Sequence, residues 1–301
     1  MMRPEMSAPQ AERHYTGAPG HQYHETKRGI PESAYPWIAR LRASKISPYV
    51  HNSDVVFEFG VGTGWNLAEL NCRRRLGCDI SGFLEQPVRA RGIEFVRDPK
   101  WMDNFSVDVA LCHHTLEHVL NPPAVLQELR RILCVNGKLL LYVPLEKEAK
   151  YHHFDANEPN HHLYSWNVQT LGNLVTEAGF KVVEAGVGEF GYDRFASVWA
   201  QKLHLGESGF RLLRRLIQIV KPMREVRIVA VKPEPTPEPH SQPRRERPQG
   251  MNRPQGENRP QGENRPQGEN RQSGENRDRR GGRPPFRRGN RGGREPRDGN
   301  R

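Results

Sequence analysis

Short apolar runs alternate with segments in which apolar residues recur at helical spacing, from about residue 31 to residue 232. The runs have the length of buried strands, and "KLLLYVP" is nearly all apolar, as in the middle of a sheet covered on both faces. They predict strands at 54–60, 76–81, 93–98, 107–113, 138–144, 181–187 and 224–233, with helices at 31–46, 64–75, 83–92, 121–137 and 166–180. This alternation favours an α/β three-layer sandwich with a mainly parallel sheet.

Composition divides the chain into three regions. Residues 1–30 are polar and rich in Pro, Gly and His without periodicity, which predicts a disordered or loosely docked segment. Residues 31–232 form the predicted folded domain, with a helical insertion at 190–221. Residues 233–301 are rich in Pro, Arg and Gly, and a hexapeptide close to "RPQGEN" repeats five times over 247–276. Because so short and polar a repeat buries nothing, the sequence predicts a disordered C-terminal tail.

The basic charge is concentrated in this tail. Residues 233–301 carry 17 arginines, no lysine and 10 acidic residues, a net +7 of the chain's +11, which leaves +4 for residues 1–232. The stretch "RRGGRPPFRRGNRGGR" resembles the RGG-type segments of RNA-binding proteins, which bind phosphates by charge and stack guanidinium groups on unpaired bases. Two alternatives remain for residues 244–301: contact with RNA or another polyanion, and a solubilising tether.

Cysteine usage and the lack of long apolar stretches favour a cytoplasmic protein. The four cysteines form no C-x-x-C pair, as expected of free thiols in a reducing compartment. They are Cys72, Cys78, Cys112 and Cys134. No apolar signal-peptide core is found near the N-terminus, and the longest apolar run, 139–145, is too short to span a bilayer. Residues 209–220 are amphipathic, which predicts a helix that covers one end of the sheet or contacts a membrane surface or partner.

The first predicted strand ends in a glycine-rich loop, "EFGVGTGW", in which Glu58 precedes three glycines at alternate positions. Trp65 stands where the third glycine of a dinucleotide fingerprint would fall, and no Lys-Ser or Lys-Thr follows as in a P-loop. A pyrophosphate is disfavoured beside a carboxylate, whereas a cationic sulfonium tolerates one. The loop therefore favours S-adenosylmethionine over a dinucleotide or a nucleoside triphosphate.

The order of motifs resembles the class I S-adenosylmethionine-dependent methyltransferases over about 200 residues. The first motif of that family is an acid followed by G-x-G-x-G, as here from Glu58 to Gly64. The stretch 105–144 resembles the family's segment from the fourth strand through the following helix, with Asn136 in place of a glycine at a turn that Asn tolerates. The resemblance implies a Rossmann-like sandwich with a seven-stranded sheet whose last strand is antiparallel.

The resemblance also implies which residues bind the cofactor, S-adenosylmethionine. Asp79 matches the acid that holds both ribose hydroxyls from the carboxyl end of the second strand. Asp98 matches an acid that contacts the adenine amino group, and the backbone near Cys112 and His113 matches the methionine side. The expected cofactor-binding residues are Glu58, Gly60, Gly62, Gly64, Asp79, Asp98, Cys112 and His113.

Histidines gather after the fourth and fifth predicted strands, where the loops of a doubly wound fold open on the ligand crevice. His114 and His153 are the candidate general bases, which are needed only if the acceptor is a hydroxyl or a protonated amine. His118 is expected to anchor the start of the next helix. A metal site that combines these histidines with Asp155 and Glu158 has no compact ligand spacing, and no metal is predicted.

The acceptor side of the predicted site is less defined. The segment "NHHLYSW" resembles one in small-molecule methyltransferases of the ubiquinone-biosynthesis group, which implies that His162, Tyr164 and Trp166 border the acceptor. The N-P-P-Y signature of amide methylation is absent. The sequence therefore predicts methyl transfer to an O or N of a small molecule or a saccharide or lipid intermediate. The alternative is an RNA- or ribosome-associated protein recruited through the tail.

Overall fold

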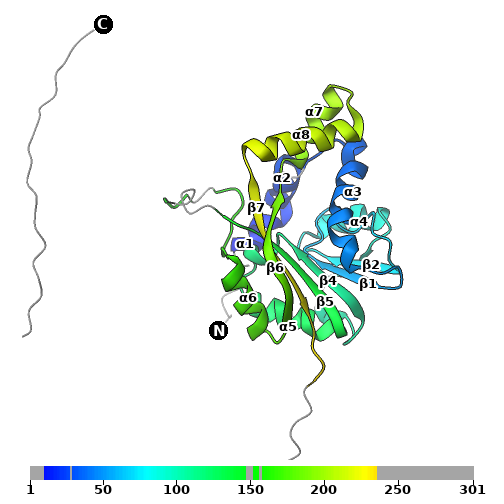
Figure 1. Cartoon of the computed structure of the whole chain (residues 1–301), viewed down its shortest axis with the longest axis vertical. Helices are drawn as coiled ribbons and strands as arrows, with labels where there is room; N and C mark the ends of the chain where they lie inside the picture. Colours follow the sequence, from blue (N-terminus) through cyan, green and yellow to red (C-terminus); the bar gives the residue numbers. More distant parts are fainter. Residues whose placement is uncertain (1–9, 28, 147–151, 156–157, 236–301) are drawn as a thin grey trace, which may run out of the picture. The chain divides into compact units, whose positions relative to one another are not determined.

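The computed structural model of the protein describes residues 10–27, 29–146, 152–155 and 158–235. Its strands form one seven-stranded sheet in the order β3-β2-β1-β4-β5-β7-β6 (Figure 1). The strands are β1 Val55–Phe59, β2 Arg74–Cys78, β3 Glu94–Phe95, β4 Val107–His113, β5 Leu133–Pro144, β6 Lys181–Phe190 and β7 Met223–Val231. β1 to β5 pair in parallel, and β7 runs antiparallel to both β5 and β6. This topology confirms the predicted Rossmann-like sheet.

Helices cover both faces of the sheet, as the three-layer prediction requires. The α-helices are α1 Gln10–Tyr15, α2 Gly17–Lys27, α3 Tyr35–Ile46, α4 Glu85–Ala90, α5 Pro122–Ile132, α6 Val168–Glu177, α7 Asp193–Lys202 and α8 Gly206–Val220. Short 3₁₀ segments are η1 Glu32–Ala34, η2 Ser47–Tyr49, η3 Gly82–Leu84, η4 Pro99–Trp101 and η5 Leu116–His118. Helices α5 and α6 lie on one side of the sheet and α3 and α4 on the other (Figure 1). Along β5, Leu139 and Leu141 belong to the core with α5 and α6, whereas Leu140 and Tyr142 belong to the core with α3 and α4. The core therefore lies on both sides of the central strands.

Helix α5 is shorter than the sequence predicts. The Asn121 side chain caps its first turn by accepting a hydrogen bond from the Ala124 backbone N at 3.1 Å. The helix ends at Ile132 instead of Gly137, because the chain enters β5 directly and bulges where Asn136 adopts φ +63°. Asn is among the residues that tolerate this left-handed conformation, as the sequence predicted for this turn.

The predicted helix at 64–75 does not form. Turns connect β1 to β2 there, and the backbone N–H groups of Leu67 and Ala68 both donate to the Gly64 carbonyl, at 3.2 and 3.0 Å. Gly64 has φ +84°, outside the helical region, and β2 begins at Arg74. Leu67 is fully buried, so its apolar spacing reflects packing of these turns against the core.

The sequence predicts a disordered or loosely docked segment at residues 1–30, whereas residues 10–27 form the helices α1 and α2. A hydrogen bond and ring contacts attach these helices to the segment after β2. The Ser81 hydroxyl donates to the Tyr15 backbone O at 2.5 Å, and the His21 ring stacks on Phe83 with centroids 3.8 Å apart. Polar contacts and aromatic rings stabilise the segment. Such contacts do not require apolar residues at helical spacing, so the sequence lacks the pattern from which a helix is predicted.

The predicted insertion at 190–221 contains α7 and α8. Phe210 of α8 is fully buried and packs with Ile38 of α3, while Ile219 and Val220 at the end of α8 are 70% and 86% exposed. Membrane or partner contact through 209–220 stays a prediction. None of the helices described here is both long and apolar enough to cross a bilayer. The predicted disorder, the repeats and the polyanion contact of the tail concern residues 236–301, which lie outside the described residues.

Candidate functional site

The glycine loop joins β1 to the turns that precede β2. Gly60, Gly62 and Gly64 have φ of +77°, +53° and +84°, a region that favours glycine. The backbone N–H groups of Gly60 and Val61 both donate to the Cys78 carbonyl at 2.9 Å. The loop is thus bound to the end of β2 and lies at the carboxyl edge of the sheet, where ligands bind in open α/β folds.

The three glycines differ in what a side chain would meet. A Cβ at Gly60 would lie 2.2–2.7 Å from atoms of the Thr115 side chain, and one at Gly64 would lie 2.7 Å from Ile93. A Cβ at Gly62 would meet nothing within 4 Å. Gly60 and Gly64 therefore allow close packing, whereas Gly62 borders open space.

This difference yields a stability prediction. Gly60→Ala is expected to lower the free energy of unfolding by about 2–5 kcal/mol, since it combines a left-handed backbone with overpacking against Thr115. Gly62→Ala has the backbone strain alone and is expected to cost about 1–2 kcal/mol. Urea unfolding of the two variants measures both values, and equal losses would contradict the close packing at Gly60.

The predicted acids take different positions. Glu58 is fully buried and accepts a hydrogen bond from Asn66 Nδ2 at 2.5 Å, which fixes the strand end beneath the loop. The Asp79 carboxylate accepts hydrogen bonds from the backbone N–H groups of Gly62 and Ser81, both at 2.9 Å. Asp98 instead caps η4 by accepting from the Lys100 backbone N at 2.9 Å.

A cavity of about 320 Å³ lies over the glycine loop. Its floor includes Gly60, Gly62 and Asp79, and its other walls include Tyr15 and Tyr23 of α1 and α2. Asp98 and Cys112 do not line it. Cys112 is fully buried, and burial raises the pKa of its thiol, so the neutral thiol is part of the core. All four cysteines are free, as predicted.

A second cavity of about 280 Å³ adjoins the first. The two share six lining residues: Tyr23, Arg42, Trp65, His113, His114 and His118. The second cavity alone is lined by Glu117, His162 and Phe190, among others. The end of β4 therefore lies between a compartment with the glycine loop and one lined by Glu117, His162 and Phe190.

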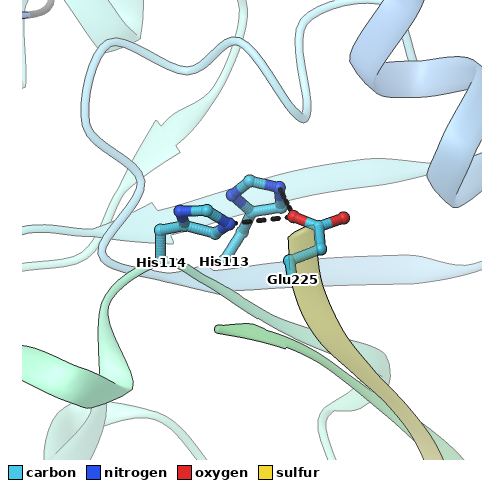
Figure 2. A group of neighbouring side chains, drawn as sticks. All are labelled: His113, His114 and Glu225. Carbon is cyan, nitrogen blue, oxygen red and sulfur yellow. Dashed lines mark hydrogen bonds and ion pairs between the residues drawn. The ribbon is translucent and has the colours of Figure 1, made fainter. Parts of the chain in front are cut away.

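His113 and His114 stack at this boundary, with ring centroids 4.5 Å apart (Figure 2). His114 Nε2 lies 2.9 Å from Glu225 Oε2, and His113 Nε2 lies 3.9 Å from the same oxygen. Glu225 is fully buried near the start of β7, and Lys45 of α3 forms an ion pair with its other oxygen. Since the carboxylate only accepts, His114 Nε2 carries the proton and Nδ1 the lone pair.

The protonation states of this pair follow from burial and charge. Burial lowers the pKa of His114 to about 4 and outweighs the opposing hydrogen bond to Glu225. For Glu225, burial raises the pKa, but the hydrogen bond from His114 and the charge of Lys45 outweigh it, and the net shift is downward. Near neutral pH the pair is therefore a neutral imidazole beside a carboxylate.

Arg42 orients the other histidine. Its Nη2 forms an ion pair with Asp193 at 2.7 Å, and its Nη1 lies 3.1 Å from His113 Nε2. Arg214 holds the second oxygen of Asp193 at 2.7 Å. The insertion helices thus contribute charged groups to the boundary between the cavities. Arg42 and Asp193 were not among the predicted site residues, because no motif surrounds either of them.

The remaining predicted residues are only partly brought together. His162 lines the second cavity, and its Nδ1 lies 2.7 Å from Glu146 Oε1. Tyr164 and Trp166 stack on each other with centroids 5.3 Å apart, and neither lines either cavity. His153 is exposed and also lines neither cavity, so His114 is the candidate base at the site.

The fold and these paired cavities define a class of protein, the Rossmann-like methyltransferases. A family model described as a methyltransferase domain matches residues 32–185, about half of the chain. The chain belongs to this family, and its resemblance to the class I S-adenosylmethionine-dependent methyltransferases is confirmed. No curated protein matches the sequence.

Solved structures with the same fold are distant in sequence. A chain from the complex between the Haloferax volcanii Trm112 methyltransferase activator and a methyltransferase is 18% identical, with a TM-score of 0.50, and the match covers 75% of this chain and 98% of that one. Phosphoethanolamine N-methyltransferase 2 from Haemonchus contortus, in complex with S-adenosyl-L-methionine, is 15% identical over 76% of this chain and 61% of that one, with a TM-score of 0.49. At such low sequence identities, the similarity shows a shared fold and does not extend to the substrate.

The first cavity fits S-adenosylmethionine. Gly62 faces space that a side chain would fill, so a ligand can approach the backbone there. Each Asp79 oxygen accepts one backbone hydrogen bond and keeps a second lone pair, and ribose hydroxyls are suitable donors to them. The carboxylate is also tolerated by a cationic ligand. The residues that would hold the cofactor are therefore the glycine loop and Asp79.

Proposed function

We propose that the protein transfers a methyl group from S-adenosylmethionine to an oxygen or nitrogen of a small molecule, or of a saccharide or lipid-linked intermediate. The observation that carries this proposal is the meeting of two adjoining cavities at the stacked His113 and His114, with a buried carboxylate behind them. One cavity has the features of a cofactor site and the other offers basic side chains to an acceptor.

Each group has a distinct role in this mechanism. The bound cofactor supplies an electrophilic methyl group on a good leaving group. The glycine loop and Asp79 would hold the donor and the second cavity would hold the acceptor, and such positioning supplies most of the rate enhancement. His114 Nδ1 accepts the proton of an acceptor hydroxyl or ammonium group. Glu225 keeps the His114 proton on Nε2 and stabilises the imidazolium that forms.

The size of the second cavity supports a small acceptor group. At about 280 Å³ it has room for a small molecule or for one unit of a longer one, and its lining includes side chains of β4, β6 and α7. The alternative, recruitment of RNA by residues 244–301, depends on the arginine-rich tail and not on this site.

A single assay tests the proposal against this alternative. The full-length chain is incubated with methyl-labelled S-adenosylmethionine and with separated small-molecule, lipid, saccharide and RNA fractions of a cell extract. Label in one of the first three fractions, lost with His114→Asn, supports the proposal, whereas label in RNA alone contradicts it. Filter binding of RNA by the full chain and by a chain ending at Lys232 then tells whether the tail is the recruiting segment.

A further inference from the structure

A second group of side chains lies on the wall of the second cavity. Glu117 and His118 belong to η5, directly after β4, and His162 follows in the loop before α6. One potential ligand atom from each residue lies within 4.8 Å of the other two. The sequence separates His162 from the other two by more than 40 residues, so only the fold brings them together.

The hydrogen bonds of His118 determine its tautomer. The Tyr15 hydroxyl donates to the Asn160 backbone carbonyl, which can only accept. The same hydroxyl lies 2.8 Å from His118 Nδ1, so its oxygen accepts from the ring N–H there. The neutral His118 ring therefore carries its proton on Nδ1 and a lone pair on Nε2, which lies 3.7 Å from Glu117 Oε1.

The neutral His162 ring has the same tautomer as His118, with the proton on Nδ1. Its Nδ1 lies 2.7 Å from Glu146 Oε1, and since a carboxylate accepts, the ring donates from Nδ1 and has its lone pair on Nε2. The His118 and His162 rings lie 4.8 Å apart at an interplanar angle of 61°. Donation of the Nδ1 proton to a carboxylate or an oxygen acceptor is how metal-binding imidazoles are oriented for ligation through Nε2.

The backbone fixes this group in place. The Glu117 carbonyl accepts hydrogen bonds from the backbone N–H groups of Leu163 and Tyr164, at 2.8 and 3.2 Å, which ties the His162 loop to η5. Glu117 is only 1% exposed, and a cation beside a buried carboxylate lowers the cost of its burial. The three groups are thus held together before any ligand binds.

A second group of two histidines and a glutamate differs from this one in the charge that surrounds it. His113, His114 and Glu225 are also close enough to share a metal ion. There, however, Lys45 pairs with Glu225 and Arg42 contacts His113, so positive charge already surrounds the carboxylate and the rings. A divalent cation is disfavoured beside two such cations.

We propose that Glu117, His118 and His162 bind a divalent first-row transition metal ion such as Zn²⁺. Two imidazole nitrogens and one carboxylate oxygen suit this class of ion, whereas Mg²⁺ prefers oxygen ligands. Three protein ligands leave coordination positions for water or for an oxygen of a molecule in the second cavity. Metal binding is independent of the methyl-transfer proposal, since it is measured without cofactor or acceptor.

Calorimetric titration of the full-length, chelator-treated protein with Zn²⁺, without a histidine tag, tests the proposal. The wild type is expected to bind one equivalent that Mg²⁺ does not displace, and Glu117→Gln and His162→Ala are each expected to weaken binding more than tenfold. His153→Ala is the matched control, because this exposed histidine lines neither cavity, and it is expected to bind as the wild type does.

A more conservative substitution tests the Zn²⁺ site with less risk of misfolding. Tyr15→Phe keeps the ring but removes the oxygen that accepts from His118 Nδ1, and is expected to weaken Zn²⁺ binding by about tenfold or more. Circular dichroism and the metal-free Tm verify that each variant is folded. Absence of a wild-type site, or an affinity unchanged in the folded Glu117→Gln and Tyr15→Phe variants, would overturn the proposal.

Discussion

Replacing Asp79 with alanine is expected to weaken S-adenosylmethionine binding by about a hundredfold or more. The change removes a carboxylate that can accept from both ribose hydroxyls, and hydrogen bonds to a charged group are each worth about 1.5–3 kcal/mol. It also removes the acceptor of the Gly62 N–H, so the loop loses one of its supports. Isothermal titration calorimetry with the cofactor measures the effect.

Asp98→Ala is the matched control for this experiment. Asp98 is also an acid close to the end of a strand, but its side chain caps η4 and does not line the cavity. Its replacement is expected to change cofactor affinity less than threefold. If the two variants lose affinity equally, the cofactor extends beyond the cavity toward η4, as the family resemblance implied for the adenine.

Loss of the His114 base is expected to reduce kcat by about 10²–10⁴-fold for a hydroxyl or ammonium acceptor. Asn is the suitable replacement, since position 114 has φ +53° and Asn tolerates the left-handed region. Steady-state kinetics with the acceptor identified by labelling measures this change. A His114→Asn variant that is folded and has kcat within threefold of the wild type would exclude a general base at this position.

The pH dependence provides a separate measurement on the wild type. His114 faces Glu225 from β7, Arg42 and Lys45 from α3, and the neighbouring His113, and burial is the largest cause of its low pKa. Because this pKa is about 4 in the folded protein, the ring stays unprotonated down to that value. The acid limb of kcat/KM is therefore expected near pH 4, and a limb near pH 6.5 would indicate a solvated histidine as the base.

The cofactor side of the site could be predicted from the sequence because its residues lie in short, neighbouring segments of the chain. The glycine loop is one continuous motif, and Asp79 follows a strand that pairs directly with β1, so position along the chain translates into position in space. Alternating apolar runs likewise predict the sheet, since burial on two faces leaves a strong pattern. The segment 64–75 is predicted as a helix because its apolar residues have helical spacing, but there Leu67 is buried by turns and not by a helix.

The acceptor side could not be predicted in the same way. Glu225 meets His114 across 111 residues of chain, and its only signal is an acid at the start of an apolar strand. Tyr15 belongs to a polar segment whose helices depend on contacts with the domain rather than on their own periodicity. Tyr164 stands two residues from His162 in sequence, yet it lines neither cavity, and His153 lines neither as well.

Tyr15 has contacts on the side of each compartment. Its backbone O binds Ser81 beside the cofactor acid, and its hydroxyl binds His118 and Asn160 on the acceptor side. We therefore expect spent donor and methylated product to share one exit step, in which α1 detaches from both. In kinetic terms, the residence time of one ligand should then depend on whether the other is still bound.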